Sequence, residues 1–428
     1  MKVLVLGSGA KDHAVAWWFS KSRMIEKLYM APASPATRDF AQGLSDVNPS
    51  DGQQVLKACR ELGIDFVFIG TEAPLMTGVV DILNSNGIST FGTPTHSLKL
   101  EADKKFSREF ARRNGVNIPD YAAFTNAEDL SAYLDKNGGK TFVIKPNDIS
   151  PSRIMTSSSD PKVLIDFAKG LLEKGPVVLD EYESGIPVTI SMFMDDNGGT
   201  LMLPICSEYT KSEHGDKGMA TGGMGAVCPV PMDYECLSNV YNQVINPTLE
   251  GMKNENLSYK GILTFSLVQT GNDFKLVDYH VRFNDPAAQT IIPLIKTDPV
   301  EIMDAIRMGT LSKVNLNVSD RSAVSVVIAS EGYPLKPRTG LRLHAVDAPY
   351  YSSSPYADTQ FFFGAVKVGE DKSVYTSGGR VATAVAFGEN ILDANRKVYE
   401  AISAVEFKGA WHREDIGNKF FSSVNAAS

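Results

Sequence analysis

A glycine-rich segment in the middle of the chain is the first candidate for chemistry. Residues 218–225 contain four glycines in eight positions, which would let the backbone approach a phosphate or a carboxylate closely. Acidic and basic side chains precede and adjoin this segment: Glu208, Lys211, Glu213, His214, Asp216 and Lys217. We interpret residues 221–226 as a turn that binds an anion. A flexible loop without a ligand is the alternative interpretation.

A second candidate turn lies near the N-terminus. The apolar run at residues 3–6 is followed by Gly7-Ser8-Gly9 and then by a helix-like stretch, an order typical of a buried parallel strand, a tight turn and a helix. Backbone amides at the helix start would favour an anion, and Lys11 and His13 add donors. The third glycine of the dinucleotide fingerprint is missing, which disfavours a nicotinamide or flavin cofactor. A tight turn without a ligand fits the same residues.

Three polar side chains alternate near the end of a strand that we predict over residues 274–279. Asp278, His280 and Arg282 would point to one face, because successive side chains of a strand alternate between its faces. They could converge on a metal–phosphate centre, although an ordinary exposed strand face has the same pattern.

Two lysines and a strand end could complete a nucleotide pocket. Lys104 and Lys145 would bind phosphates, and the end of a predicted strand at residues 177–182 would face the edge of an adenine ring. None of these features is specific by itself.

The order of strand-like and helix-like segments predicts several domains. Residues 1 to about 100 alternate between the two and indicate a small doubly wound α/β domain, with ligands at the carboxyl ends of its strands. We expect helices at residues 74–85, 98–114 and 233–254. The next segments predict a small α+β lid and an antiparallel sheet, and the C-terminal segments alternate strand and helix. The fold class is therefore α/β and α+β multidomain, and the predicted divisions are residues 1–103, 104–191, 192–324 and 325–428.

The composition is that of a globular protein without a nucleic-acid surface. The 428 residues exceed what one hydrophobic core usually organises, and 43% of them are hydrophobic. The net charge of −8, without a basic run, argues against nucleic-acid binding. No apolar run approaches a membrane span of about 18 residues, so we expect a cytoplasmic protein without a membrane partner. We also expect a monomer or a homodimer. We expect the four cysteines to be buried free thiols: Cys59, Cys206, Cys228 and Cys236.

Short motifs along the whole chain resemble those of the phosphoribosylamine–glycine ligase family, ATP-grasp enzymes of purine biosynthesis. The matching segments, in order, are residues 7–13, 70–75, 91–95, 100–104, 143–145, 180–182, 221–226, 282–286, 332–334, 378–381 and 413–417. The resemblance implies a pre-ATP-grasp domain, an ATP-grasp core with a small lid, and a C-terminal mixed α/β domain. It also implies a ligase that uses ATP to convert a small carboxylate into an acyl phosphate, which the amine of phosphoribosylamine then attacks.

The resemblance implies roles for the residues that match these motifs. Lys104 and Lys145 would hold the nucleotide phosphates. The backbone of the adjacent strand end would contact adenine: Asp180, Glu181 and Tyr182. The phosphoribosylamine-like substrate would contact the two glycine-containing segments: Gly9, Lys11, Asp12, His13, Thr221, Gly222, Gly223, Met224 and Gly225. Arg282 and Asp285 would lie near the reacting groups as catalytic residues.

The nucleotide loop departs from the family's pattern. The family has Gly-Leu-Ala-x-Gly-Lys-Gly after the lysine strand, whereas residues 148–154 here are Asp-Ile-Ser-Pro-Ser-Arg-Ile. Three glycines are lost, and Pro151 has no amide donor, so close contact between the backbone and phosphates should be reduced. Arg153 keeps a positive charge at the lysine position, which makes it a third candidate catalytic residue.

The metal and acyl-donor positions depart as well. Asp278 and His280 replace a glutamate and an asparagine, so binding of Mg should be weakened while Mn would tolerate the imidazole better. Ile186-Pro187 replaces a ribose-binding carboxylate pair, and Ala287-Ala288 replaces an acidic residue and a threonine. We therefore expect an enlarged, less polar pocket for the acyl donor and poor use of glycine.

Three functions remain open at this point. The first is an ATP-dependent carboxylate–amine ligase with an altered acyl donor or amine. The second is a non-catalytic homologue that binds a phosphorylated ligand without ATP turnover. The third is a different reaction on the same scaffold, with a metal at Asp278 and His280.

If the protein turns over ATP, Arg153→Ala should slow turnover about tenfold or more, because each charge-assisted phosphate contact contributes roughly 1.5–3 kcal/mol. ATP binding by the unmodified protein should itself be weak. Steady-state phosphate release and calorimetric titration measure these two quantities. An unchanged rate in an active Arg153→Ala protein would remove Arg153 from the site.

Overall fold

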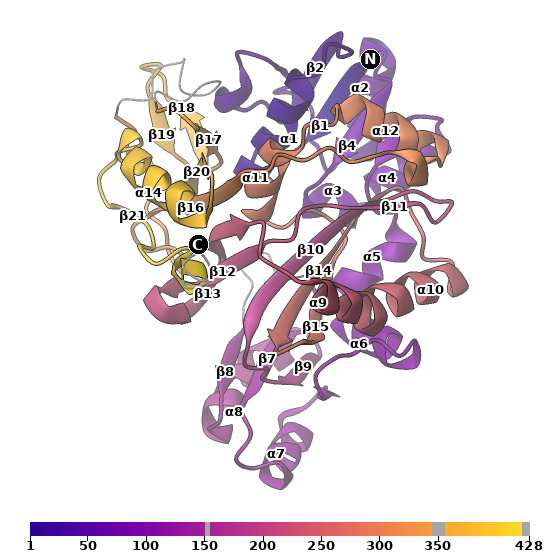
Figure 1. Ribbon diagram of the computed structural model, residues 1–428, viewed down its shortest axis with the longest axis vertical. Coiled ribbons are helices and arrows are strands. Elements are labelled where there is room, and N and C mark those ends of the chain that lie inside the picture. The colour runs from indigo at the N-terminus through magenta and orange to yellow at the C-terminus, as the bar shows by residue number, and fades with distance from the viewer. Residues whose placement is uncertain (150–154, 345–355, 422–428) are drawn as a thin grey trace.

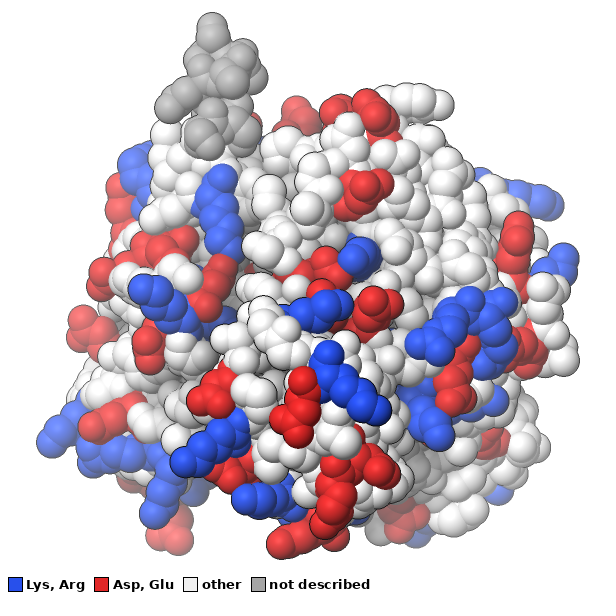
Figure 2. All heavy atoms as spheres, turned by 90° about the horizontal axis from the view of Figure 1, so that it is seen from below, with Lys and Arg blue, Asp and Glu red and all other residues white. Residues whose placement is uncertain are grey.

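The computed structural model describes residues 1–149, 155–344 and 356–421. Figure 1 shows the N-terminal sheet at one end, the lid at the opposite end, and the C-terminal strands beside the central sheet. In these three ranges no helix is long and apolar enough to cross a membrane. Figure 2 shows positive and negative side chains interspersed, rather than gathered by sign, on the face that it presents.

The N-terminal sheet has five parallel strands, as predicted for a doubly wound domain. In spatial order they are β3 (Gln42–Gly43), β2 (Lys27–Ala31), β1 (Lys2–Leu6), β4 (Phe66–Ile69) and β5 (Ser89–Phe91). Its helices are α1 (Ala10–Ser20), α2 (Gly52–Leu62), α3 (Glu72–Met76) and α4 (Val79–Ser85). Val3 and Val5 enter one hydrophobic core cluster, whereas Leu4 and Leu6 enter another, so both faces of β1 are buried.

Two helices that we expected to be continuous are interrupted. Residues 74–85 form parts of α3 and α4, which are separated at Gly78 with a φ of +72°. Residues 98–114 divide into α5 (Thr95–Ala102) and α6 (Lys104–Arg113). Asp103 lies between them in an extended conformation and caps α6, because its side chain accepts a hydrogen bond from the Phe106 amide at 2.9 Å. This cap sets the position of Lys104 at the start of α6.

The lid is a small antiparallel sheet with its own core. Its strands, in spatial order, are β6 (Tyr121–Phe124), β9 (Val177–Glu181), β7 (Phe142–Pro146) and β8 (Thr156–Ser158). Helices α7 (Ala127–Lys136) and α8 (Pro161–Leu172) cover it, and their Leu130, Leu134 and Leu164 are buried in the lid core. Figure 1 shows this unit projecting from the rest of the molecule.

The central sheet is antiparallel, as expected. Its strands, in spatial order, are β11 (Thr200–Met202), β10 (Ile186–Met194), β14 (Gly261–Thr270) and β15 (Asp273–His280). The predicted helix at residues 233–254 is made of α9 (Tyr234–Val240), a π-helical turn η3 (Tyr241–Ile245) and α10 (Asn246–Asn254). The four cysteines are buried and free, as predicted.

A third large sheet joins the core to the C-terminal part of the chain. It contains β12 (Ser207–Glu213), β13 (Lys217–Cys228), β16 (Ser322–Ser330), β20 (Arg380–Gly388), β17 (Thr359–Phe363) and β21 (Ala410–Trp411). Beside it lie β18 (Val366–Val368), β19 (Val374–Thr376), α11 (Ala287–Ile291), α12 (Pro299–Met308) and α14 (Ile391–Ala401). Pairing of β13 with β16 crosses the predicted division at residue 324. The fold class is as predicted, and the four numbered divisions stay a prediction.

The glycine-rich segment is a strand, so the prediction of a turn at residues 221–226 was wrong. A Cβ atom on Gly225 would lie 2.6 Å from the carbonyl oxygen of Ser325, and a Cβ on Gly222 would lie 2.7 Å from the Arg380 guanidinium. The glycines are therefore needed because neighbouring groups approach the backbone closely, and the strand is continuous from Lys217 to Cys228.

Gly225→Ala should lower the free energy of unfolding by about 1–3 kcal/mol, because the new methyl group would collide with the backbone of β16. Gly170→Ala is the matched control: Gly170 is exposed on α8 and has no neighbour within 4 Å of an added Cβ. The control should be stabilised by about 0.5–1 kcal/mol. Urea denaturation measures both, and equal stability of the two variants would contradict the close approach at Gly225.

Candidate active site

Two neighbouring cavities lie where the lid meets the central sheet. The central cavity, of about 280 Å³, has a charged lining that includes Lys104, Lys145, Glu208, Asp278 and Arg282. The edge cavity, of about 160 Å³, is mainly apolar and shares Lys145 and Asp278 with the central cavity. Val268 and Val277 also line both cavities. One ligand could therefore place a planar ring in the edge cavity and an anionic group beside the two lysines of the central cavity.

Five buried charged side chains form an ionic cluster between these two cavities. Lys104 and Arg108 come from α6, Lys145 from β7, Asp180 from β9 and Asp278 from β15. The Asp278 carboxylate lies 3.0 Å from Lys145 Nζ, 3.3 Å from Lys104 Nζ and 3.4 Å from Arg108 Nη2. Asp180 accepts two hydrogen bonds from Arg108 and lies 2.8 Å from Lys145. Three cations and two carboxylates leave one net positive charge, which suits a phosphate.

The ionic cluster changes the predicted role of Asp278. Burial alone would raise the pKa of its carboxyl group, but Lys104, Lys145 and Arg108 hold that pKa well below its ordinary value. His280 is engaged too: its Nδ1 lies 3.1 Å from Glu101 Oε1 and its Nε2 lies 3.1 Å from Ser266 Oγ. The described ranges contain no group of three or more His, Cys, Asp or Glu residues that could hold a metal ion. Asp278 and His280, as arranged here, do not fit a divalent cation.

Arg282 lies at the junction of the central cavity and a third cavity. Its Nη2 is 2.7 Å from Glu72 Oε1 and 2.8 Å from Glu101 Oε1. Burial would raise the pKa of Glu72, but Arg282 outweighs this and lowers it to about 2. The N-terminal cavity, of about 350 Å³, is lined by Arg282 and by residues of the first turn, including Gly9, Lys11 and Asp12. One buried guanidinium therefore faces both cavities.

The first turn is built around Asp12. Its Oδ2 accepts a hydrogen bond from the Gly9 amide at 3.0 Å, and burial raises the pKa of its carboxyl group to about 6. Gly7 has a φ of +137°, and a Cβ there would lie 2.3 Å from the Asp12 carboxylate, so only glycine fits. Lys11 Nζ donates to the carbonyl of Phe283 at 3.4 Å, which ties the turn to the strand end that carries Arg282.

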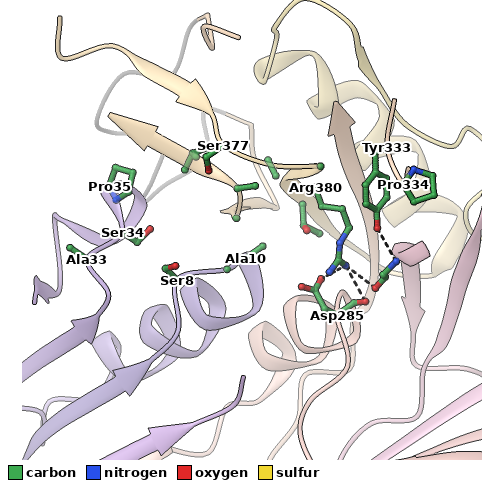
Figure 3. A pocket seen from close by; sticks show the side chains of 18 residues that line it. Ser8, Ala10, Ala33, Ser34, Pro35, Asp285, Tyr333, Pro334, Ser377 and Arg380 are labelled. Carbon is green, nitrogen blue, oxygen red and sulfur yellow. Dashed lines mark hydrogen bonds and ion pairs between the residues drawn. The ribbon is translucent and has the colours of Figure 1, made fainter. Parts of the chain in front are cut away.

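A fourth cavity opens between the N-terminal and C-terminal parts of the chain. This C-terminal cavity, of about 440 Å³, shares Gly9, Gly222, Asp285 and Arg380 with the N-terminal cavity. Figure 3 shows Arg380 and Asp285 directed toward one another, with Tyr333 beside them. Arg380 Nη1 lies 2.9 Å from Asp285 Oδ1 and donates to the Gly222 carbonyl at 2.8 Å. The Tyr333 hydroxyl accepts from the Gly222 amide at 2.8 Å, so the backbone of β13 is held at the cavity wall.

Comparison with known proteins identifies the family. Models of phosphoribosylglycinamide synthetase match the chain in order, with the N domain at residues 1–101, the ATP-grasp (A) domain at 102–288 and the C domain at 323–419. Phosphoribosylamine–glycine ligase of Clostridium acetobutylicum is 32% identical over 428 residues, which cover 97% of this chain and 99% of that protein. The chain belongs to the phosphoribosylamine–glycine ligase family. The enzyme of Rhodopirellula baltica is 31% identical and covers 99% of both chains.

Solved structures agree with this placement. Phosphoribosylamine–glycine ligase of Thermotoga maritima has a TM-score of 0.82 and 25% identity, covering 97% of this chain and 100% of that one. The biotin carboxylase domain of 2-oxoglutarate carboxylase from Hydrogenobacter thermophilus, solved with MgADP and bicarbonate, shares the fold at a TM-score of 0.72 and 14% identity. Phosphoribosylamine–glycine ligases are ATP-dependent carboxylate–amine ligases. These comparisons give no support to the non-catalytic alternative.

The structure brings many of the predicted site residues of this family member together. The central cavity holds Lys104, Lys145, Thr221, Asp278, His280 and Arg282, and the N-terminal cavity holds Gly9, Lys11, Asp12, Gly222, Arg282 and Asp285. Asp180, Glu181 and Tyr182 line the edge cavity. The amides of Glu181 and Tyr182 already donate to the carbonyls of Asp120 and Thr141, so those two amides are not available to adenine. Arg153 lies outside the described residues.

Other predicted residues lie elsewhere. His13 is fully buried behind the turn, where its Nδ1 accepts a hydrogen bond from the Phe363 amide at 3.0 Å. Met224 is fully buried in β13, and Gly223 and Gly225 pack against Asp285 and Ser325. Their predicted roles in substrate binding stay untested.

The expectation of an enlarged acyl-donor pocket was wrong. Ala287 and Ala288 have no exposed surface and pack in the hydrophobic core beside α1, and they line none of the four cavities described above. Their small side chains therefore say nothing about the size or polarity of the donor site. The expectation that glycine would be a poor substrate loses its physical basis.

Our interpretation of the sequence missed Arg108 and gave no role to Glu101. Arg108 follows Lys104 by four residues and so lies on the same face of α6, a spacing that could have indicated a shared partner. Glu101 lies in the last turn of α5, but its partners are at the end of β15 and just after it, for example the Val281 amide at a separation of 180 positions. Sequence spacing carries no signal for such a contact.

Asp278→Asn should bind ATP more tightly in metal-free buffer, by about tenfold, because the loss of one carboxylate raises the positive charge around the phosphate position. Calorimetric titration with EDTA and then with Mg measures this. Asp273→Asn, on the exposed part of the same strand, is the control. If Asp278 acts mainly as a metal ligand, its substitution will instead weaken ATP binding in Mg and leave binding in EDTA unchanged.

Proposed function

We propose that this protein joins a small carboxylate to a phosphoribosylamine-like amine by way of an acyl phosphate formed with ATP. One observation carries the proposal: the buried Arg282 lines both the central cavity, which contains the two lysines, and the N-terminal cavity, which contains the first turn. A nucleotide in the first cavity and an amine in the second would meet at this side chain. The reaction needs such a meeting point, because the acyl phosphate forms on one side and is attacked from the other.

Each charged group has a task that follows from its place. A carboxylate is a poor electrophile until it is phosphorylated, and Lys104 and Lys145 would stabilise the charge on the phosphoryl group during its transfer. Arg282 would stabilise the negative charge on the acyl oxygen as the amine attacks. Asp285 accepts a hydrogen bond from Gln289 at 2.7 Å and lines both the N-terminal cavity and the C-terminal cavity. We place it as the group that accepts the proton released by the attacking amine.

Weak nucleotide and metal binding is part of this proposal. Asp148 and Ile149 line the central cavity at the position where the family has the start of its glycine loop. Asp148 replaces the first glycine of that loop, and its side chain limits contact between the backbone and phosphates, so more of the binding must come from the ionic cluster. Asp278 is already surrounded by cations, so we propose that a divalent metal binds only weakly. A cytoplasmic location and a monomeric or homodimeric state also remain predictions.

The decisive measurement is phosphate release from ATP that requires both a carboxylate and a phosphoribosylamine-type amine. Arg282→Lys should lower kcat at least about tenfold, because lysine keeps a charge but has one terminal nitrogen, whereas Arg282 uses Nη2 for Glu72 and Glu101 and Nη1 for the carbonyl of Phe283. Arg307→Lys, at an exposed ion pair on α12, should leave kcat unchanged. An unchanged kcat in a folded Arg282→Lys protein would remove Arg282 from the reacting groups.

A wild-type protein that binds ATP but releases no phosphate with any pair of substrates would support the non-catalytic alternative instead.

A further inference from the structure

Two of the four buried cysteines lie opposite each other on neighbouring strands. β12 and β13 pair antiparallel, with Ser207 opposite Val227. One position further along this register, Cys206 lies opposite Cys228, because residue numbers fall on one antiparallel strand as they rise on the other. Both cysteines have no exposed surface and belong to the same hydrophobic core cluster, so their side chains lie on one face of the strand pair.

The backbone of Cys206 shows which kind of pair this is. Its N–H donates to the Thr189 carbonyl at 3.0 Å, and its carbonyl accepts from the Thr189 amide at 2.7 Å, so both groups face β10 rather than β13. Cys206 and Cys228 therefore form a non-hydrogen-bonded pair, in which facing Cα atoms lie about 4.5 Å apart and the side chains are closest. Disulfides span Cα separations of roughly 4.4–6.8 Å. An S–S bond here requires rotation of two side chains and no shift of either strand.

We propose that Cys206 and Cys228 are a site of reversible oxidation, at which hydrogen peroxide joins them in a cross-strand disulfide. The thiolate of one cysteine attacks a peroxide oxygen and the O–O bond breaks, which leaves a sulfenic acid and a hydroxide that takes up the thiol proton to become water. The second thiol attacks the sulfenic sulfur, the S–O bond breaks, and the S–S bond forms with release of a second water. Two thiols thus lose two hydrogens while one peroxide becomes two waters.

The surroundings of the pair make this reaction slow while the strands are closed. Burial raises the pKa of the Cys206 thiol, with smaller contributions from Glu208 and Cys228, and burial also raises the pKa of the Cys228 thiol. Because the thiolate is the form that attacks, oxidation waits until water and peroxide reach the pair. The pair lies at one end of the strand pairing, since β12 begins at Ser207 and β13 ends at Cys228. Ends of elements open more readily than their centres, so access begins here.

The cross-link would fasten one wall of the central cavity in its present position. Thr189 and Glu208 line that cavity, and Thr189 Oγ1 donates a hydrogen bond to Glu208 Oε2 at 2.8 Å. The backbone of Thr189 pairs with Cys206, and Glu208 follows Cys206 by two positions. Because the strands need not move, the disulfide should raise the midpoint of thermal unfolding by about 3 °C, through the constraint that it places on the unfolded chain.

The test maps disulfides in folded wild-type protein that has been treated with hydrogen peroxide, quenched with catalase and alkylated. Digestion with trypsin and a glutamate-specific protease places Cys206, Cys228 and Cys236 on separate peptides, because Lys211 and Glu235 lie between them. We expect one linked pair of peptides, which contains Cys206 and Cys228, at a yield at least about tenfold above any other disulfide. Dithiothreitol should restore both thiols and reverse the rise in the unfolding midpoint.

Two variants supply the controls. Cys228→Ala removes one partner and leaves a small apolar side chain, so oxidation of Cys206 should proceed to a sulfinic acid that dithiothreitol does not reverse. Cys236→Ala, on α9, should keep both the link between Cys206 and Cys228 and the rise in the midpoint.

Absence of the link from wild-type protein, after an exposure that converts the exposed Met308 to its sulfoxide, would overturn the inference, and this measurement needs no variant to fold. A link between Cys206 and Cys228 that forms only above the urea unfolding transition would also overturn it, since the native register would then play no part. A midpoint that falls on oxidation would refute the fit of the pair to a disulfide. None of these results bears on the proposed ligase function, because no readout is an enzymatic activity.

Discussion

The ionic cluster around Asp278 is the interaction on which the site depends. It joins the lid, through Lys145 and Asp180, to α6 and to β15 of the central sheet. Charges buried in this way are costly when one partner is missing, so the five side chains hold each other in one geometry. The lid therefore cannot be displaced without exposing unpaired charges. The cluster keeps one positive charge in excess, and an anionic ligand would neutralise it.

The polar side chains that follow Asp278 on the same face are also held by buried partners, but by different ones. Asp278, His280 and Arg282 all line the central cavity, so the alternation seen in the sequence correctly gave the direction of their side chains. Asp278 contacts lysines, His280 contacts Glu101 and Ser266, and Arg282 contacts Glu72 and Glu101. Three alternate positions on one face thus have three different sets of partners.

The limits of prediction from the sequence follow from these contacts. Apolar runs identified the buried strands, because burial on both faces leaves a local signature. The breaks at Gly78 and Asp103 also had local signals, a left-handed glycine and a capping aspartate, which we did not use. The glycines at Gly222 and Gly225 were misread, because a glycine that avoids a collision with another strand looks the same in a sequence as a glycine in a turn. The partners of Asp278 and Glu208 come from distant segments and leave no local pattern.

Polar groups in this site fall into two kinds, and the difference indicates where ligands bind. Asp278 and both ring nitrogens of His280 are satisfied by other residues, so a ligand must compete with the protein for them. Glu208 Oε1, Asn284 Oδ1 and Arg282 Nε are buried and unsatisfied, so a ligand that completes them meets no competition. Since an unmet buried polar group costs about 1–3 kcal/mol, a fold retains such groups where a ligand offsets that cost. A ligand that contacts Asp278 or His280 must therefore displace one of their present partners, whereas a ligand that reached the unsatisfied atoms would displace none.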